Sequence, residues 1–149
     1  MSKQTISVFG LGSMGFGVAC SALAAGHNVF GFDVNIASQD RFLAKGGHRA
    51  EIVDAGALSD VVISVVLNGA QTTEIPFGEM GIVPHMRPGS LVVSCATVAP
   101  DLARELAGKC DAFQVLYLDA PISGGSVEAA DGALRMMASG SADALDAIT

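Results

Sequence analysis

The sequence predicts an α/β fold, a doubly wound parallel sheet with helices on both faces. Short runs of β-branched and aromatic residues alternate with helical patterns, and parallel strands need such helical crossovers. The run over 61–67 is continuously apolar, as expected of a strand that helices cover on both faces. Glycine contributes 18 of the 149 residues, which favours tight turns between strands and helices. A chain of this length fits one domain.

The first half of the chain contains three of the expected strands. A β-branched and aromatic run predicts a strand over 5–10, and mostly small residues predict a helix over 13–25 that lies close to the sheet. A second strand follows over 28–33, and a helix over 36–45. A short helix or loop over 52–58 then leads to the third strand, which is the apolar run over 61–67.

The second half is less regular. Prolines interrupt residues 72–86, which are predicted to be helix and irregular chain. A strand over 90–94 and a helix over 100–110 lead to a fifth strand over 115–119. Residues 133–138 predict a sixth strand, and Ser141 is expected to cap a helix that begins at Ala142. That helix has no stop signal before Thr149, so we expect the natural domain boundary further along the chain.

Charge and composition exclude several classes of protein. Eight basic and 15 acidic side chains give a net charge of −7, without the basic clusters that bind nucleic acid. No apolar stretch reaches the ~18 residues of a membrane span, and residues 1–5 lead into a strand pattern without the features of a signal peptide, so we expect none. The three cysteines lack metal-ligand spacing and fit reduced thiols. We therefore expect a cytoplasmic protein that uses no nucleic acid, membrane or metal.

The strongest motif lies at the first strand-to-helix turn, where residues 10–15 read Gly-Leu-Gly-Ser-Met-Gly. In such a motif Gly10 makes the turn, Gly12 lets a pyrophosphate approach backbone N–H groups, and Gly15 packs helix on strand. Asp33 ends the second strand 18 residues after Gly15, where a carboxylate accepts hydrogen bonds from an adenosine ribose. Together they predict a Rossmann-type dinucleotide site. The alternative is that the glycines serve only turn geometry and Asp33 caps a strand.

The surroundings of Asp33 favour NAD over NADP as the cofactor. A carboxylate there repels the 2′-phosphate of NADP, and Val34 and Asn35 supply no compensating cation. The loops after the third and fourth strands add further candidates, although turn formation explains Asn68 equally well and local backbone bonding explains Thr97 equally well. The predicted cofactor contacts are Gly10, Leu11, Gly12, Ser13, Met14, Gly15, Asp33, Val34, Asn35, Leu67, Asn68 and Thr97.

A second motif follows the fifth strand, where residues 119–125 read Asp-Ala-Pro-Ile-Ser-Gly-Gly. The hydroxyl of Ser123 and the N–H groups of Gly124 and Gly125 form a natural cradle for a substrate carboxylate beside the nicotinamide. A tight turn is the competing explanation.

Other reactive side chains are interpreted as structural. His27 follows a helix-ending glycine and fits a surface or packing role, and Cys95 has no base placed to activate it. Met136 and Met137 are expected to fill the core. No nucleophile triad, metal site or paired carboxylates emerge, so the sequence supplies no group for proton transfer.

Residues 10–15 with Ala25-Gly26-His27, and residues 119–125 continuing to Ala130 and Gly132, resemble the β-hydroxyacid dehydrogenase family. This family includes the 3-hydroxyisobutyrate, tartronate semialdehyde and L-threonate dehydrogenases, and residues 68–82 and 137–141 look most similar to the L-threonate enzymes. The resemblance implies that Ser123, Gly124 and Gly125 bind the carboxylate or hydroxyls of a small hydroxy acid. It also implies that Thr97 reaches the cofactor. Two positions depart from the family: Ala96 replaces a common serine, and Asn68 a common proline.

The resemblance further implies that residues 1–149 are the NAD-binding domain of an oxidoreductase. The family's catalytic lysine and a nearby asparagine lie downstream, at the junction with an all-helical domain that builds the homo-oligomer. Lys109 has no motif around it and is no substitute. The chain alone is therefore expected to bind cofactor with little or no turnover. A non-catalytic NAD-responsive regulatory module is the alternative from another class, and a methyltransferase is a third possibility.

Overall fold

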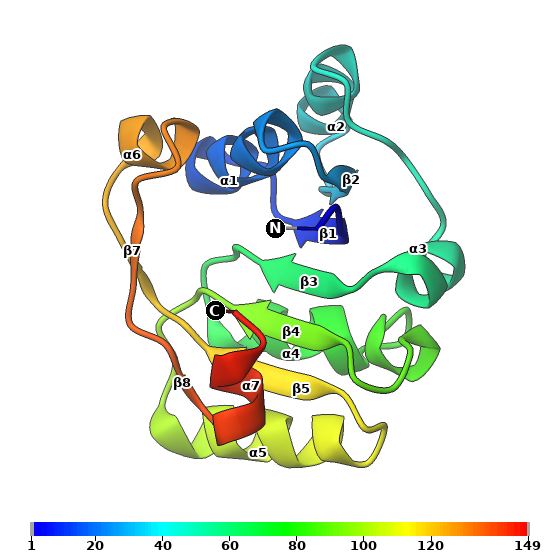
Figure 1. Ribbon diagram of the computed structural model, residues 1–149, viewed down its shortest axis with the longest axis vertical. Helices are drawn as coiled ribbons and strands as arrows, with labels where there is room; N and C mark the ends of the chain where they lie inside the picture. The colour runs from blue at the N-terminus through cyan, green and yellow to red at the C-terminus, as the bar shows by residue number, and fades with distance from the viewer. Residues whose placement is uncertain (1, 149) are drawn as a thin grey trace.

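A computed structural model describes residues 2–148 and builds them around a six-stranded sheet (Figure 1). The first half contains β1 (Thr5–Phe9), α1 (Ser13–Ala24), β2 (Asn28–Phe32), α2 (Ile36–Ala44), α3 (Ile52–Leu58), β3 (Val61–Ser64) and α4 (Gly69–Phe77). The second half contains η1 (Val83–His85), β4 (Leu91–Ser94), α5 (Pro100–Asp111), β5 (Leu116–Asp119), β6 (Ile122–Ser123), α6 (Ser126–Ala130), β7 (Arg135–Met136), β8 (Ser139–Gly140) and α7 (Ala142–Asp146).

The sheet has the strand order β2-β1-β3-β4-β5-β8. The strands β1 to β5 run parallel, and the short β8 pairs with β5 in the antiparallel direction. Because the order runs outward in both directions from β1 and β3, the crossover helices lie on both faces. The doubly wound α/β arrangement predicted from the alternating pattern is confirmed, and α3 resolves the short helix or loop as a helix.

Apolar side chains pack against both faces of the sheet. On one face Phe9, Val62 and Val92 join Leu106 of α5 in a buried cluster. Val8 and Ala19 belong to the cluster on the other face, where α1 and α2 cover the sheet. Because helices cover both faces of the sheet, Val61, Val62 and Ile63 of β3 are all apolar although they point alternately to opposite faces.

Two strand predictions are corrected by the structure. The third strand ends at Ser64, and Leu67 in the following loop is 89% exposed. Residues 133–138 do not form the sixth strand of the sheet, because β7 pairs instead with β6 in a separate two-stranded ribbon. The sixth strand is β8. The helix cap predicted at Ser141 is confirmed, since its hydroxyl accepts a hydrogen bond from Ala144 N at 3.1 Å.

Residues 120–138, which we call the arm, leave the sheet between β5 and β8. The arm consists of β6, α6 and β7, and it runs past the carboxyl ends of the strands to place α6 beside α1 (Figure 1). Met136 and Met137 lie on this arm with exposed fractions of 45% and 67%, so the prediction that they fill the core is wrong. The ribbon is separate from the helix-covered sheet, and both residues of β7 are exposed.

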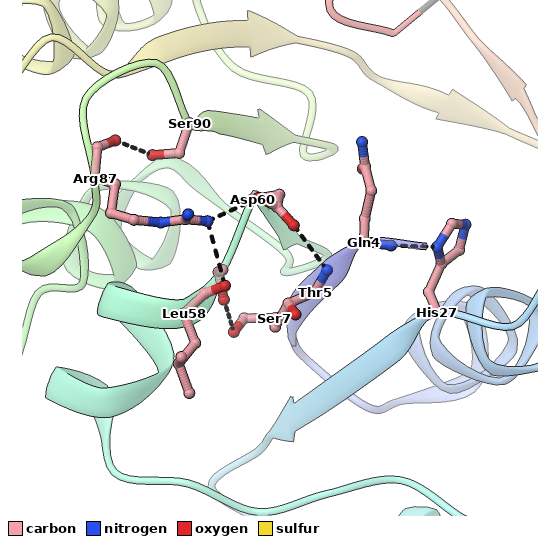
Figure 2. Close-up of polar contacts among 9 residues, drawn as sticks. Gln4, Thr5, Ser7, His27, Leu58, Asp60, Arg87 and Ser90 are labelled. Carbon is pink, nitrogen blue, oxygen red and sulfur yellow. Dashed lines mark hydrogen bonds and ion pairs between the residues drawn. The ribbon is translucent and has the colours of Figure 1, made fainter. Parts of the chain in front are cut away.

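The amino ends of the strands are tied by a polar network (Figure 2). The Asp60 carboxylate accepts a hydrogen bond from Thr5 N at 2.9 Å and pairs with Arg87 at 2.7 Å. The hydroxyls of Ser7 and Ser59 lie 2.7 Å apart in the interior beneath it. This network joins β1, β3 and the turn before β4 at the edge opposite the arm.

Among residues 2–148, no helix is long and apolar enough to cross a membrane. The same part of the chain brings no three metal-ligating side chains together. Cys20, Cys95 and Cys110 are free thiols.

Candidate functional site

The glycine motif forms the turn between β1 and α1. Gly10 has a φ of 93°, in the left-handed region that favours glycine, and its N–H donates to Phe32 O at 2.8 Å. Gly12 is the N-cap residue of α1, which begins at Ser13. The amino end of a twelve-residue helix therefore opens at this loop, where its unpaired N–H groups favour a phosphate.

The three glycines of the motif meet different surroundings. A Cβ atom on Gly15 would lie 1.6 Å from Gly10 O, and one on Gly10 would lie 2.1 Å from Val65 O. Both positions are therefore closed by backbone. A Cβ on Gly12 would meet nothing within 4 Å. Gly12 is thus the position at which a ligand can approach the loop, and the residues present fit a pyrophosphate.

Asp33 follows β2 directly and lies beside the glycine loop. One carboxylate oxygen accepts a hydrogen bond from Leu11 N at 2.6 Å, and the other accepts from Asn35 N at 2.8 Å. Val34 is fully exposed, whereas the side chain of Asn35 caps α2 by accepting from Ala37 N at 2.9 Å. Neither neighbour places a cation near the carboxylate.

The remaining predicted cofactor contacts differ in their surroundings. The Leu11 side chain is buried, so only its backbone faces the loop, while Ser13 is exposed and Met14 is half-buried. The Asn68 side chain accepts from Gln71 N at 2.9 Å and caps α4. This contact favours the turn-forming explanation for Asn68. Thr97 is exposed in the loop after β4.

The second motif begins the arm. Ser123 ends β6 and is exposed, and Gly124 has a φ of 134°. Gly125 caps α6, and its N–H donates to Glu128 Oε2 at 2.9 Å. Hydrogen bonds from the backbone N–H groups of Glu128 itself and of Gly125 lower the pKa of the Glu128 carboxyl. One predicted donor of the substrate cradle is therefore engaged by Glu128.

Sequence reasoning missed Glu128, although a signal was present. A residue that caps a helix and a glutamate three positions later form a capping box, and Gly125 and Glu128 have that spacing. The pattern was obscured because glycine has no capping side chain of its own.

The carboxyl ends of the central strands carry a polar row that the sequence analysis did not single out. Ser64, Ser94 and Asp119 occupy neighbouring register positions on β3, β4 and β5. Burial raises the pKa of the Asp119 carboxyl, and it raises the pKa of the nearby Tyr117 hydroxyl to about 12. The row extends across the sheet to Asp119, the residue with which the second motif begins.

Two other side chains have the packing roles expected for them. Cys95 is buried, and burial together with the nearby Asp119 raises the pKa of its thiol to about 12. A thiol with such a pKa stays protonated at neutral pH and is a poor nucleophile. His27 Nδ1 accepts a hydrogen bond from Gln4 N at 3.0 Å, which ties the start of β2 to the amino terminus of β1.

The chain is similar in sequence to several known proteins. Residues 5–149 match the family described as the NAD binding domain of 6-phosphogluconate dehydrogenase. The chain is 44% identical over 143 residues to an L-threonate dehydrogenase from Cupriavidus necator, covering 95% of this chain and 48% of that protein. It is 36% identical over 144 residues to an NAD-dependent L-serine dehydrogenase from Pseudomonas aeruginosa, covering 96% and 48%.

The fold is also similar to that of a solved structure. The crystal structure of 3-hydroxyisobutyrate dehydrogenase from Salmonella typhimurium superposes with a TM-score of 0.91 at 36% identity, over 98% of this chain and 51% of that chain. The chain thus spans about half the length of the curated relatives that it matches. Because the family match extends over residues 5–149, the chain belongs to the family of the NAD-binding domain of 6-phosphogluconate dehydrogenase.

Proposed function

We propose that this chain is the cofactor-binding domain of an NAD-dependent dehydrogenase that oxidises a small 3-hydroxy acid, of the L-threonate or 3-hydroxyisobutyrate type. The observation that carries the proposal is that both motifs meet at one helix. The glycine loop opens α1, and α6, which directly follows Ser123, Gly124 and Gly125, packs on the same helix. Such an arrangement suits a reaction in which a substrate meets a bound dinucleotide.

The roles of the chain's residues follow from their surroundings. The backbone of residues 10–15 and the amino end of α1 hold the pyrophosphate, which approaches past Gly12. Leu11, whose N–H donates to Asp33, lines the loop and fixes its shape, and Ser13 and Met14 contribute through the first turn of the helix. Asp33 accepts hydrogen bonds from the adenosine ribose. When bound, NAD supplies the hydride acceptor at its nicotinamide ring.

The preference for NAD over NADP rests on charge. The Asp33 carboxylate repels a 2′-phosphate, and the exposed side chain of Val34 and the helix-capping side chain of Asn35 offer it no cation. Thr97 and the backbone of Leu67 and Asn68 complete the cofactor edge in this proposal. The name of the Pseudomonas aeruginosa relative, an NAD-dependent enzyme, supports the same preference.

The substrate contacts are proposed at the start of the arm. The Ser123 hydroxyl and the Gly124 N–H bind the carboxylate or a hydroxyl of the hydroxy acid. Gly125, whose N–H donates to Glu128, lines the cradle and fixes its backbone. We assign proton transfer from the reacting hydroxyl to a lysine outside residues 1–149, as the resemblance to the β-hydroxyacid dehydrogenases implies. In this proposal residues 1–149 form one domain of a cytoplasmic homo-oligomer.

The test is a calorimetric titration of the chain with NAD, NADP and S-adenosylmethionine in parallel. We expect NAD to bind at least about tenfold more tightly than NADP. Tighter binding of NADP would contradict the role given to Asp33, and binding of S-adenosylmethionine alone would indicate a methyltransferase. A chain that binds none of the three contradicts the proposal.

A second measurement separates a dehydrogenase domain from an NAD-responsive regulatory module. Ser123→Ala is expected to weaken the binding of L-threonate to the NAD-saturated chain and to leave the dissociation constant for NAD unchanged. A change that affects only NAD affinity would favour the regulatory module, because a sensor needs no substrate cradle.

A further inference from the structure

The contact between α1 and α6 joins two segments that are far apart in the sequence (Figure 1). The hydroxyl oxygen of Ser21 on α1 lies 2.7 Å from Ala129 O and 3.1 Å from Ala130 O, the last two carbonyls of α6. A single side chain therefore donates to the carboxyl end of a helix 108 positions away. Carbonyls at a helix end have no partner within the helix, so a donor from outside satisfies them.

Gly17 makes this contact possible. A Cβ atom at position 17 would lie 2.7 Å from both Ala129 Cβ and Ala130 N, closer than atoms of folded proteins approach. Gly17 and Ser21 are four residues apart and so lie on the same face of α1. The glycine provides the space in which α6 rests, and the serine provides the hydrogen bond.

The same helix is fixed to the cofactor loop at its other end. Gly15, in the first turn of α1, is packed so closely that a Cβ atom would lie 1.6 Å from Gly10 O and 3.3 Å from Val65 Cβ. Close packing of this kind resists displacement. A movement of α1 would therefore also move the glycine loop, and α6 is attached to an element that cannot shift independently of the cofactor site.

Hydrogen bonds within the arm link its outgoing and returning segments to each other. At its base Met137 N donates to Pro121 O at 3.1 Å, next to the pairing of β5 with β8. At its tip Ala133 N donates to Glu128 O at 2.7 Å, and Glu128 Oε2 accepts from Gly125 N. These two bonds join α6 to the residues on either side of it, so the position of α6 determines the position of Gly125.

We propose that Ser21 is a positioning residue that fixes the loop of Ser123, Gly124 and Gly125 relative to the cofactor loop. Ser21 touches neither the cofactor loop nor the proposed substrate contacts, and it acts through α6. The inference rests on the proposed function only in taking that loop as the substrate cradle; the placement of the loop by Ser21 is a separate claim.

The test compares three variants of the 149-residue chain. Ser21→Ala removes the hydroxyl, Ser21→Thr keeps it, and Ser38→Ala is the control, a serine on α2 away from α6 (Figure 1). Amide hydrogen exchange of residues 123–133, the amide resonances of Gly124 and Gly125, and the dissociation constant for NAD are measured for each. We expect Ser21→Ala to increase exchange in residues 123–133 about tenfold and to shift both glycine resonances.

The other variants distinguish positioning from general stability. Ser21→Thr should restore exchange and resonances to those of the unaltered chain, Ser38→Ala should change neither, and all variants should bind NAD within about twofold of one another. Exchange that is unchanged in Ser21→Ala, that rises equally throughout the chain, or that Ser21→Thr does not restore would overturn the proposal. Failure of the unaltered chain to bind NAD would instead count against the proposed function, because the exchange measurement does not depend on ligand.

Discussion

The Asp33 carboxylate accepts a hydrogen bond from Leu11 N at 2.6 Å, across the turn between β1 and α1. Its second oxygen accepts from Asn35 N at 2.8 Å, which fixes the orientation of the group. The acid at the end of β2 therefore braces the glycine loop as well as facing the proposed ribose site. A substitution of Asp33 is therefore expected to affect both the glycine loop and the proposed ribose site.

Removing this carboxylate is expected to weaken NAD binding strongly. Asp33→Ala loses the ribose contact and the hydrogen bond from Leu11 N. Because hydrogen bonds to a charged group are stronger than neutral ones, we expect the dissociation constant for NAD to rise about 10- to 100-fold. Asp33→Asn keeps an oxygen acceptor without the charge, so its preference should shift toward NADP. Calorimetry with both cofactors measures the ratio. Unchanged NAD affinity in Asp33→Ala would contradict the ribose role.

Replacing Gly12 or Gly15 by alanine should affect different properties: Gly12→Ala the affinity for NAD, and Gly15→Ala the free energy of unfolding. Gly12→Ala adds a methyl group where nothing lies within 4 Å, so the free energy of unfolding should stay within about 0.5 kcal/mol while NAD affinity falls at least about tenfold. Gly15→Ala directs a methyl group at Gly10 O and should cost at least about 2 kcal/mol of stability. Urea denaturation and NAD titration of both variants provide the comparison. Equal stability losses in the two would refute the assigned roles.

The network at the amino ends of the strands is expected to contribute stability without affecting cofactor binding. Asp60→Ala removes the acceptor for Thr5 N and the partner of Arg87, which predicts a loss of about 1–2 kcal/mol. Asp40→Ala breaks the more exposed ion pair with Arg49 and should cost less than about 0.5 kcal/mol. Urea midpoints compare the two, and NAD affinity should be the same in both. A loss of NAD binding in Asp60→Ala would show that the two edges of the sheet are coupled.

Alkaline pH is expected to destabilise the fold. Burial raises the pKa of the Cys95 and Cys110 thiols from 9.0 to about 12. Between these values the unfolded chain has lost protons that the folded chain retains, so stability is fully present below pH 9 and is lost as pH rises toward 12. Each thiol lowers the folding equilibrium constant by up to about tenfold per pH unit in this window.

Urea midpoints measured from pH 8 to pH 11 test this dependence. A chain with both Cys95→Ala and Cys110→Ala should show a flatter profile. If the profile of the double variant were as steep as that of the unaltered chain, other groups would have to account for the loss.

The parallel strands could be predicted because each carries its own local signal. The run that contains β3 is apolar except at Ser64, and every strand up to β5 is followed by a helical pattern or a glycine turn. The arm offers no such signal. Its strands β6 and β7 are only two residues long. The apolar residues around Met136 and Met137 resemble a buried strand, although β7 pairs with β6 in a ribbon that is separate from the main sheet.

The candidate site likewise has parts that local sequence predicts and parts that it does not. The glycine motif and Asp33 are recognisable because both belong to one strand-helix-strand unit, β1-α1-β2, in which their spacing is regular. The packing of α6 on Gly17 and Ser21 depends on how separate units of the chain meet. A spacing of 108 residues between partners leaves no periodic trace in the sequence, so side-chain placement in three dimensions is needed to find such pairs.

The packing of α6 against α1 also predicts the order in which parts of the chain fold. Its partners lie 108 residues apart, and closing so long a loop is entropically costly until the intervening sheet holds the ends together. We therefore expect the turn between β1 and α1 to form early in folding and the arm to dock late. Ser21→Ala should then speed unfolding and leave the folding rate nearly unchanged, a φ-value near zero that stopped-flow kinetics can measure.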